Sequence, residues 1–322
     1  MDDPDRQSDD SEADGGWADE TGWSDDGTDD GGTDDDGTDD GGADDSEWDV
    51  GVDDVGGDAG GGETAVGPAG GSDWRGHAKT IGAMLGLVVV AFVMGVLAIV
   101  VLSVGLIVAG VEVTETDSLF VSLVGIQGIG FPLTAYGYLR YTDREFQRFI
   151  PTRVPSLKEI LLIVGSAVGA LVLVAITASV LVSLLSTEPA ANSGGQTVAE
   201  NPEIVPYLLP FVFLLNGPGE ELLFRGVIQG RFREDYGGPV AIVLASLMFA
   251  PAHIVSLVGS PQAAAITISI LTVPSLVFGA VYEYTDNFTV PALVHGLYNS
   301  ILFGSIYLVS VYGDGVSELI VF

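Results

Sequence analysis

Residues 80–109 read TIGAMLGLVVVAFVMGVLAIVVLSVGLIVA, a stretch of thirty residues without a charged side chain. An α-helix needs about 20 consecutive apolar residues to cross a hydrocarbon core about 30 Å thick. Short apolar runs also occur in the cores of globular proteins, whereas a run of this length is typical of a transmembrane helix. The stretch therefore predicts a membrane-spanning helix.

Six more apolar segments follow, separated by short polar loops. With the first, the predicted spans are 80–109, 118–139, 159–186, 204–230, 239–258, 263–284 and 288–312. This spacing predicts an all-α fold, a polytopic membrane helix bundle of about seven transmembrane helices. We assign residues 79–322 to this membrane domain and expect the lipid bilayer to surround it.

Residues 1–78 have a different composition. The whole chain carries a formal net charge of −33, and residues 1–73 hold 27 of its 44 acidic residues beside one basic residue. Asp pairs alternate there with Gly, Thr and Ala, so almost nothing could build a core and we predict a disordered acidic tail. Trp17, Trp23 and Trp48 could form a docking motif for an unknown partner. A solvated, charge-repelling tail is the plainer interpretation.

The composition also excludes some classes of function. The chain has no cysteine, so disulfides and thiolate chemistry are excluded. Its acidity argues against nucleic acid as a partner, because nucleic acid needs a basic surface. Acid excess with only two lysines is similar to the composition of halophilic archaeal proteins. No basic amino-terminal region precedes an apolar stretch, so we expect no cleaved signal peptide.

Basic residues alternate between the loops. Loop 140–158 holds five of them and residues 231–234 hold two, whereas the loops around 112–117 and 187–203 hold none. Because cytoplasmic loops carry the excess of Lys and Arg, we predict that the amino-terminal tail, loop 140–158 and loop 231–238 are cytoplasmic. The carboxyl end then lies outside.

Charged residues interrupt the fourth apolar segment. Residues 216–226 read NGPGEELLFRG, and each ionised group would cost several kcal/mol at the bilayer centre, so an intramembrane charge suggests a functional site. Glu221 and Arg225 share a helical face and can pair, while Glu220 is rotated by about 100° and stays free. We expect Gly217, Pro218 and Gly219 to loosen or kink the helix. A buried ion pair between helices is the structural alternative.

Two of the three histidines lie inside apolar segments. His253 ends the motif FAPAH and His295 begins HGLYN, in which Asn299 lies four residues later on the same helical face. His77 precedes the first span and is expected to be exposed. One membrane histidine often only bonds to a neighbouring helix. Two histidines, an asparagine and a carboxylate pair predict a shared polar site.

These residue types suit hydrolysis. Glu and His together can deprotonate a water molecule, and Asn with a second His can donate hydrogen bonds to a developing oxyanion. Glu220, His253 and His295 could instead hold Zn²⁺ or another divalent metal that activates the water. Both mechanisms remain open. The chain has neither HExxH nor GxSxG.

The ordered motifs resemble a known family. Glu220-Glu221-Leu-Leu-Phe-Arg225 fits EExxxR, Phe249-Ala-Pro-Ala-His253 fits FxxxH, and His295-Gly-Leu-Tyr-Asn299 fits HxxxN. In this order on successive membrane helices they resemble the CAAX prenyl protease and bacteriocin-processing family, CPBP or Abi. The likeness covers about residues 159–312.

The resemblance implies an intramembrane endopeptidase whose cavity opens to the cytosol. By motif position, Glu220 and His253 would activate water, His295 and Asn299 would stabilise the oxyanion, and Arg225 would fix Glu221. Family members are commonly labelled metalloproteases, and a metal-free glutamate mechanism is also argued. The implied partners are protein or peptide substrates, including prenylated ones. Helix arithmetic puts Glu220 and His295 about 10 Å below the cytoplasmic end and His253 nearer 20 Å.

Two other classes of function stay open. A non-catalytic scaffold or immunity protein of the same fold would use the polar residues for structure and partner binding. A transporter also places charges near the membrane midplane, but no inverted repeat is evident in the sequence.

Overall fold

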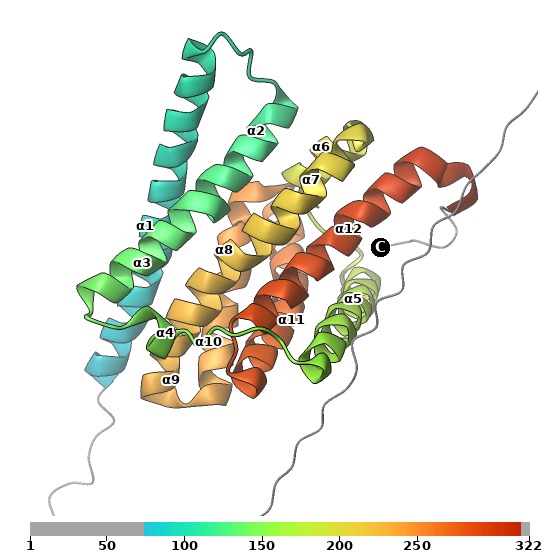
Figure 1. Ribbon diagram of the computed structural model, residues 1–322. Helices are drawn as coiled ribbons and strands as arrows, with labels where there is room; N and C mark the ends of the chain where they lie inside the picture. The colour runs from blue at the N-terminus through green and yellow to red at the C-terminus, as the bar shows by residue number, and fades with distance from the viewer. Residues whose placement is uncertain (1–73, 317–322) are drawn as a thin grey trace, which may run out of the picture. The chain divides into compact units, whose positions relative to one another are not determined.

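The structure is a computed structural model that describes residues 74–316. The predicted disordered tail lies outside the described residues up to Asp73, as does the Trp17–Trp23–Trp48 docking motif. The first helix begins at Trp74, five residues before the start predicted for the membrane domain. The described residues fold almost entirely into helices (Figure 1).

All seven predicted spans are helical, within a few residues of the predicted bounds. In chain order the spans are α1 (Trp74–Val108); α2 (Glu115–Ser122), η1 (Leu123–Gly130) and α3 (Phe131–Tyr141); α5 (Leu157–Leu185); η2 (Pro202–Ile204), α7 (Val205–Phe211), η3 (Val212–Asn216), α8 (Gly217–Glu221), η4 (Leu222–Gln229) and α9 (Gly230–Tyr236); α10 (Gly238–Ala252) with η5 (His253–Ser256); α11 (Pro261–Thr285); and α12 (Thr289–Val316). Six are long and apolar enough to cross a membrane. The fourth span becomes the seventh candidate if it is counted as one span with α6 (Ser193–Glu200), from which it is bent by 101°.

Successive spans run in opposite directions, so the connections gather at two ends of the bundle (Figure 1). The first, here called the cationic end, comprises the start of α1, the loop 142–156 with α4 (Phe146–Phe149), and the turn between α9 and α10. The other, here called the α6 end, comprises the loops 109–114, 186–192 and 257–260 together with α6. There β1 (Ala191–Asn192) pairs antiparallel with β2 (Leu257–Val258).

The fourth span is an irregular helix that packs closely on its neighbours. Two wider π-helical stretches, η3 and η4, flank α8, and such segments are frequent at functional sites. A Cβ on Gly219 would overlap the backbone carbonyl of Gln127 on η1, and one on Gly217 would lie 2.6 Å from the Gly296 nitrogen on α12. The helix continues through the Gly-Pro-Gly stretch without a break, and it is wider on both sides of that stretch. These glycines instead let three helices approach backbone to backbone.

Apolar side chains lie on both the inside and the outside of the bundle. Phe131, Phe224 and Phe249 pack edge to face in its interior, with ring centroids 6.1 and 5.1 Å apart. On α1, Val89, Val93 and Val101 are more than half exposed. Such an apolar exterior suits lipid rather than water, as the sequence predicts for a membrane bundle.

Candidate active site

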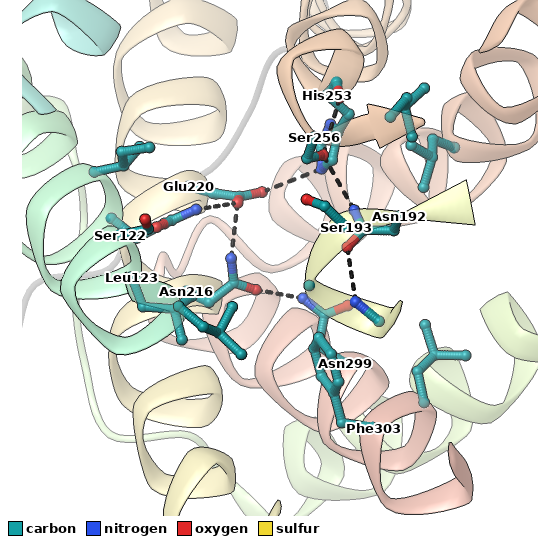
Figure 2. Close-up of a pocket in the computed structure, with 18 of the residues that line it drawn as sticks. Ser122, Leu123, Asn192, Ser193, Asn216, Glu220, His253, Ser256, Asn299 and Phe303 are labelled. Carbon is teal, nitrogen blue, oxygen red and sulfur yellow. Dashed lines mark hydrogen bonds and ion pairs between the residues drawn. The ribbon is translucent and has the colours of Figure 1, made fainter. Parts of the chain in front are cut away.

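The predicted site residues come together beside one cavity. They lie on four elements: Glu220 and Glu221 on α8, Arg225 on η4, His253 on η5, and His295 and Asn299 on α12. Four of the six line the cavity, and the other two, Glu221 and Arg225, are fully buried behind it. Figure 2 shows Glu220, His253 and Asn299 converging from different helices.

Glu220 has one held oxygen and one free oxygen. Its Oε1 accepts hydrogen bonds from Asn216 Nδ2 at 2.8 Å and from Gln127 Nε2 at 3.2 Å. Its Oε2 is buried with no hydrogen-bond partner among the described residues. That oxygen lies 3.9 Å from the Nε2 atoms of both His253 and His295. The carboxylate is thus held in place with its free oxygen facing two imidazole rings.

Behind Glu220, three charged or titratable groups form a buried chain. Arg225 Nε donates to Glu221 Oε2 at 2.9 Å, and Glu221 Oε1 lies 2.9 Å from His295 Nδ1. A carboxylate only accepts, so this contact assigns a proton to Nδ1. In a neutral His295 ring, Nε2 is then a bare acceptor, and it becomes a donor only in the imidazolium form.

Aromatic rings and a serine fix this chain in position. Arg225 donates from a terminal nitrogen to Ser275 Oγ at 3.0 Å, and its guanidinium lies 5.0 Å from the Phe249 ring centre. The His295 ring stacks on Phe278 at 4.7 Å. Burial of this kind is tolerated because the charges are paired and hydrogen-bonded.

His253 also has its tautomer set by a hydrogen bond. Its Nδ1 lies 3.1 Å from the carbonyl oxygen of Phe249, which can only accept, so Nδ1 carries the proton. The neutral ring then presents a bare Nε2 to Glu220. Ser256 donates to the His253 carbonyl and accepts from Asn192 Nδ2, which ties the turn to β1 (Figure 2).

Asn299 reaches Glu220 through a second amide. Its Nδ2 donates to Asn216 Oδ1, and Asn216 donates in turn to Glu220 (Figure 2). An amide nitrogen carries two hydrogens, so Asn299 keeps a second donor beyond the one that Asn216 accepts.

The cavity has a volume of about 880 Å³ and opens at the α6 end. Its exposed lining residues include Ser118 on α2, Asn192 on β1, Ser193 at the start of α6, Val255 on η5 and Ser310 on α12. Toward the cationic end it is closed by the buried rings of Phe131, Phe224, Phe249 and Phe278.

This geometry corrects the predicted depth of the site. Glu220 lies 16 residues before the end of α9 at Tyr236, which is about 24 Å at 1.5 Å per residue. His253, counted from the start of α10, lies at about 22 Å, so these two residues share one level. At the turn before α12, Phe288 N donates to Pro151 O.

Residues 202–301 match a family model described as type II CAAX prenyl endopeptidase Rce1-like. The matched segment runs from η2 into α12 and contains all six predicted site residues. The match covers 100 of the 322 residues, and this segment is similar to that protease family. With its six or up to seven apolar helices the chain is a multi-pass membrane protein. No curated protein and no solved structure matched the chain.

Sequence reasoning missed two residues that hold Glu220. Asn216 lies four residues before Glu220, so helical spacing alone could have paired them. Gln127 is the lone amide in an apolar stretch of the second span and lies outside the segment matched by the Rce1-like model. Its polarity inside a membrane segment was the available signal. Its partner could not be read from the sequence, because the two residues are 93 positions apart.

The predicted metal ligands do not form a metal site as arranged. Within residues 74–316, no three His, Asp or Glu side chains are grouped so that they could hold a metal ion. Glu220 Oε2 remains 3.9 Å from each imidazole Nε2. Zinc binding by Glu220, His253 and His295 would need these side chains to move, and it stays a prediction. Elemental analysis of the purified protein checks it.

Proposed function

We propose that this protein is an intramembrane endopeptidase that uses Glu220 and His253 to activate a water molecule. Its substrates are membrane-associated or lipid-modified proteins and peptides. One observation carries the proposal: the free, buried Glu220 Oε2 faces the bare Nε2 of His253 at 3.9 Å. A water admitted between them could lie about 2.8 Å from both atoms and donate one hydrogen to each.

Peptide hydrolysis then needs three proton and electron movements. The water oxygen attacks the carbonyl carbon of the scissile bond while Glu220 takes one of its protons. The carbonyl electrons move onto oxygen and form an oxyanion. When the carbon–nitrogen bond breaks, the oxyanion electrons re-form the carbonyl and the proton held by Glu220 passes to the leaving nitrogen. The products are an amine and a carboxylic acid, which releases its remaining proton to water.

In this mechanism His295 and Asn299 stabilise the oxyanion by donating hydrogen bonds to it. Asn299 offers the N–H that Asn216 does not use, and His295 offers Nε2–H when its ring is protonated. Glu221 lies against Nδ1 of that ring, where a carboxylate stabilises a positive charge on the ring, and Arg225 holds Glu221 in place. The Glu221–Arg225 ion pair therefore positions His295 in addition to joining its own helix turns.

The cavity supports a peptide substrate with an apolar part. At about 880 Å³ it lies within the range of 300–1,000 Å³ typical of ligand pockets. Aromatic side chains close its deep end beside the catalytic groups. The description of the matched family points to prenylated CAAX segments as one substrate class.

The test is a quantitative survey of protein termini in cells that carry either the wild-type protein or Glu220→Gln at equal abundance. The glutamine keeps Oε1 for Asn216 and Gln127 and can donate its amide to the histidines, so the fold should survive. Loss of a general base costs typically 10²- to 10⁴-fold in rate. We expect a set of termini that the wild type produces and the variant does not.

Glu112→Gln is the matched control, because it makes the same chemical change in an exposed loop. It should give the wild-type termini. If no terminus depends on Glu220 while both variants stay folded, the hydrolase proposal fails and a scaffold becomes the better interpretation. Metal analysis of the same purified samples separates a zinc-dependent from a metal-free reaction.

A further inference from the structure

The two ends of the bundle differ in their basic residues. Within residues 74–316, every Lys and Arg except the buried Arg225 lies at or near the cationic end: Arg75, Lys79, Arg140, Arg144, Arg148, Arg153, Lys158, Arg231 and Arg233. The described loops of the α6 end and α6 itself contain no Lys or Arg.

Several of these cations also hold the cationic end together. Arg144 pairs with Glu234 at 2.7 Å, and Arg153 pairs with Glu159 at 2.6 Å. Arg233 pairs with Glu283 at 3.0 Å. Three connections of the bundle are thus joined by ion pairs at one membrane surface.

The excess of Lys and Arg in short loops near helix ends is retained on the cytoplasmic side, and acidic residues contribute little to this choice. All of these loops are short, so the rule applies to each of them. It places the cationic end in the cytoplasm. The cavity opens at the opposite end, past α6 and the β1–β2 pair.

We propose that the active-site cavity opens on the extracytoplasmic side of the membrane. The substrate is then a segment exposed on the outer face or in the outer leaflet, such as the translocated part of a membrane protein or a lipid-modified exported peptide. Naming a substrate rests on the proposed hydrolase function, whereas the side of the opening does not.

This inference departs from the cytosolic opening that the family resemblance implies. In this chain, a cytosolic cavity would require all nine cations of the cationic end to lie outside. The buried Phe131, Phe224, Phe249 and Phe278 separate the catalytic groups from that end, so the cavity does not reach both surfaces.

The absence of cysteine allows a direct experiment. Ser193→Cys places a thiol at the exposed rim of the cavity, and Gln147→Cys places one on the exposed loop of the cationic end. A membrane-impermeant maleimide is added to intact cells and, separately, to inverted membrane vesicles. We expect Ser193→Cys to be labelled in intact cells and Gln147→Cys to be labelled only in the inverted vesicles.

The opposite labelling pattern would overturn the inference. Ala199→Cys, also exposed and also at the rim, repeats the measurement at a second position in case one thiol reacts poorly. Labelling in detergent confirms that each thiol is reactive. The pattern does not depend on catalysis, so a failure of sidedness is distinguished from a failure of Glu220-dependent cleavage in the terminus survey.

Discussion

Glu220 and Glu221 show how two carboxylates on adjacent residues take separate roles. Glu221 is enclosed by Arg225 and His295, whereas Glu220 keeps one oxygen free in the cavity. A helix rotates adjacent side chains by about 100°, so a single turn can present one acid to the ion pair and the other to a substrate. Glu221 should therefore govern folding, and Glu220 should govern cleavage.

Glu221→Ala should therefore reduce stability more than Glu220→Ala. Removing Glu221 leaves Arg225 buried without its anion, and breaking a buried pair costs about 3–5 kcal/mol. Removing Glu220 orphans only the amides of Asn216 and Gln127. Membrane abundance and thermal unfolding in detergent measure the difference. Equal losses in the two variants would contradict this division of roles.

Asn216→Ala should slow cleavage while the protein stays folded. The variant loses a hydrogen bond to the Glu220 carboxylate, and such bonds to charged groups contribute about 1.5–3 kcal/mol. If that energy serves to orient the carboxylate, cleavage should slow by about 10- to 100-fold. Asn201→Ala is the control, since the hydrogen bond that its side-chain amide makes among residues 74–316 goes to the Thr197 carbonyl, away from Glu220. Unchanged cleavage with Asn216→Ala would remove Asn216 from the site.

At the scale of the elements, the fourth span joins the site to the rest of the bundle. Its α8 turn touches η1 through Gly219 and α12 through Gly217, and these contacts bring Gln127 and His295 to the level of Glu220. Small residues at helix interfaces allow such backbone approach in membranes. The glycines thus set the distances within the site.

Gly219→Ala should destabilise the protein and reduce cleavage. The new methyl group would overlap the Gln127 carbonyl, and overpacking of this kind costs about 1–3 kcal/mol. Gly165→Ala on α5 meets nothing within 4 Å and should be neutral or stabilise by up to about 1 kcal/mol, because alanine favours the helix. The unfolding temperature should fall for Gly219→Ala and should stay the same or rise for Gly165→Ala. A similar fall for both variants would contradict the packing argument.

At the scale of the whole molecule, the described residues hold five hydrophobic clusters. The residues of these clusters run from Ile81 to Tyr307 and join helices that are far apart in the chain. Membrane proteins of this kind satisfy their backbone polar groups within the helices. The acidic amino-terminal segment is rich in charged residues and poor in apolar ones.

Deletion of residues 2–73 should leave membrane insertion and thermal unfolding unchanged. The deleted segment offers almost no apolar surface to bury, and nine cations remain at the cationic end to orient the bundle. Detergent-solution unfolding and the cysteine labelling described above measure both properties. A lower unfolding temperature, or inverted labelling, would show that the segment supports the fold or its orientation.

The sequence by itself determined the helical bundle, its seven segments and the motifs at Glu220, His253 and His295. Hydrophobic length and helical spacing are local properties, so they can be read along the chain. The ion pair of Glu221 with Arg225 followed from the same spacing, because both residues lie on one turn of helix.

Only the tertiary structure decided which distant residues complete the site and where the cavity opens. Gln127 and Ser275 come from other spans, and their contacts depend on how closely those helices pack rather than on any local pattern. The opening at the α6 end follows from which end the aromatic rings fill. Local sequence sets where each helix begins and ends, whereas the cavity between the helices exists only once the helices have packed.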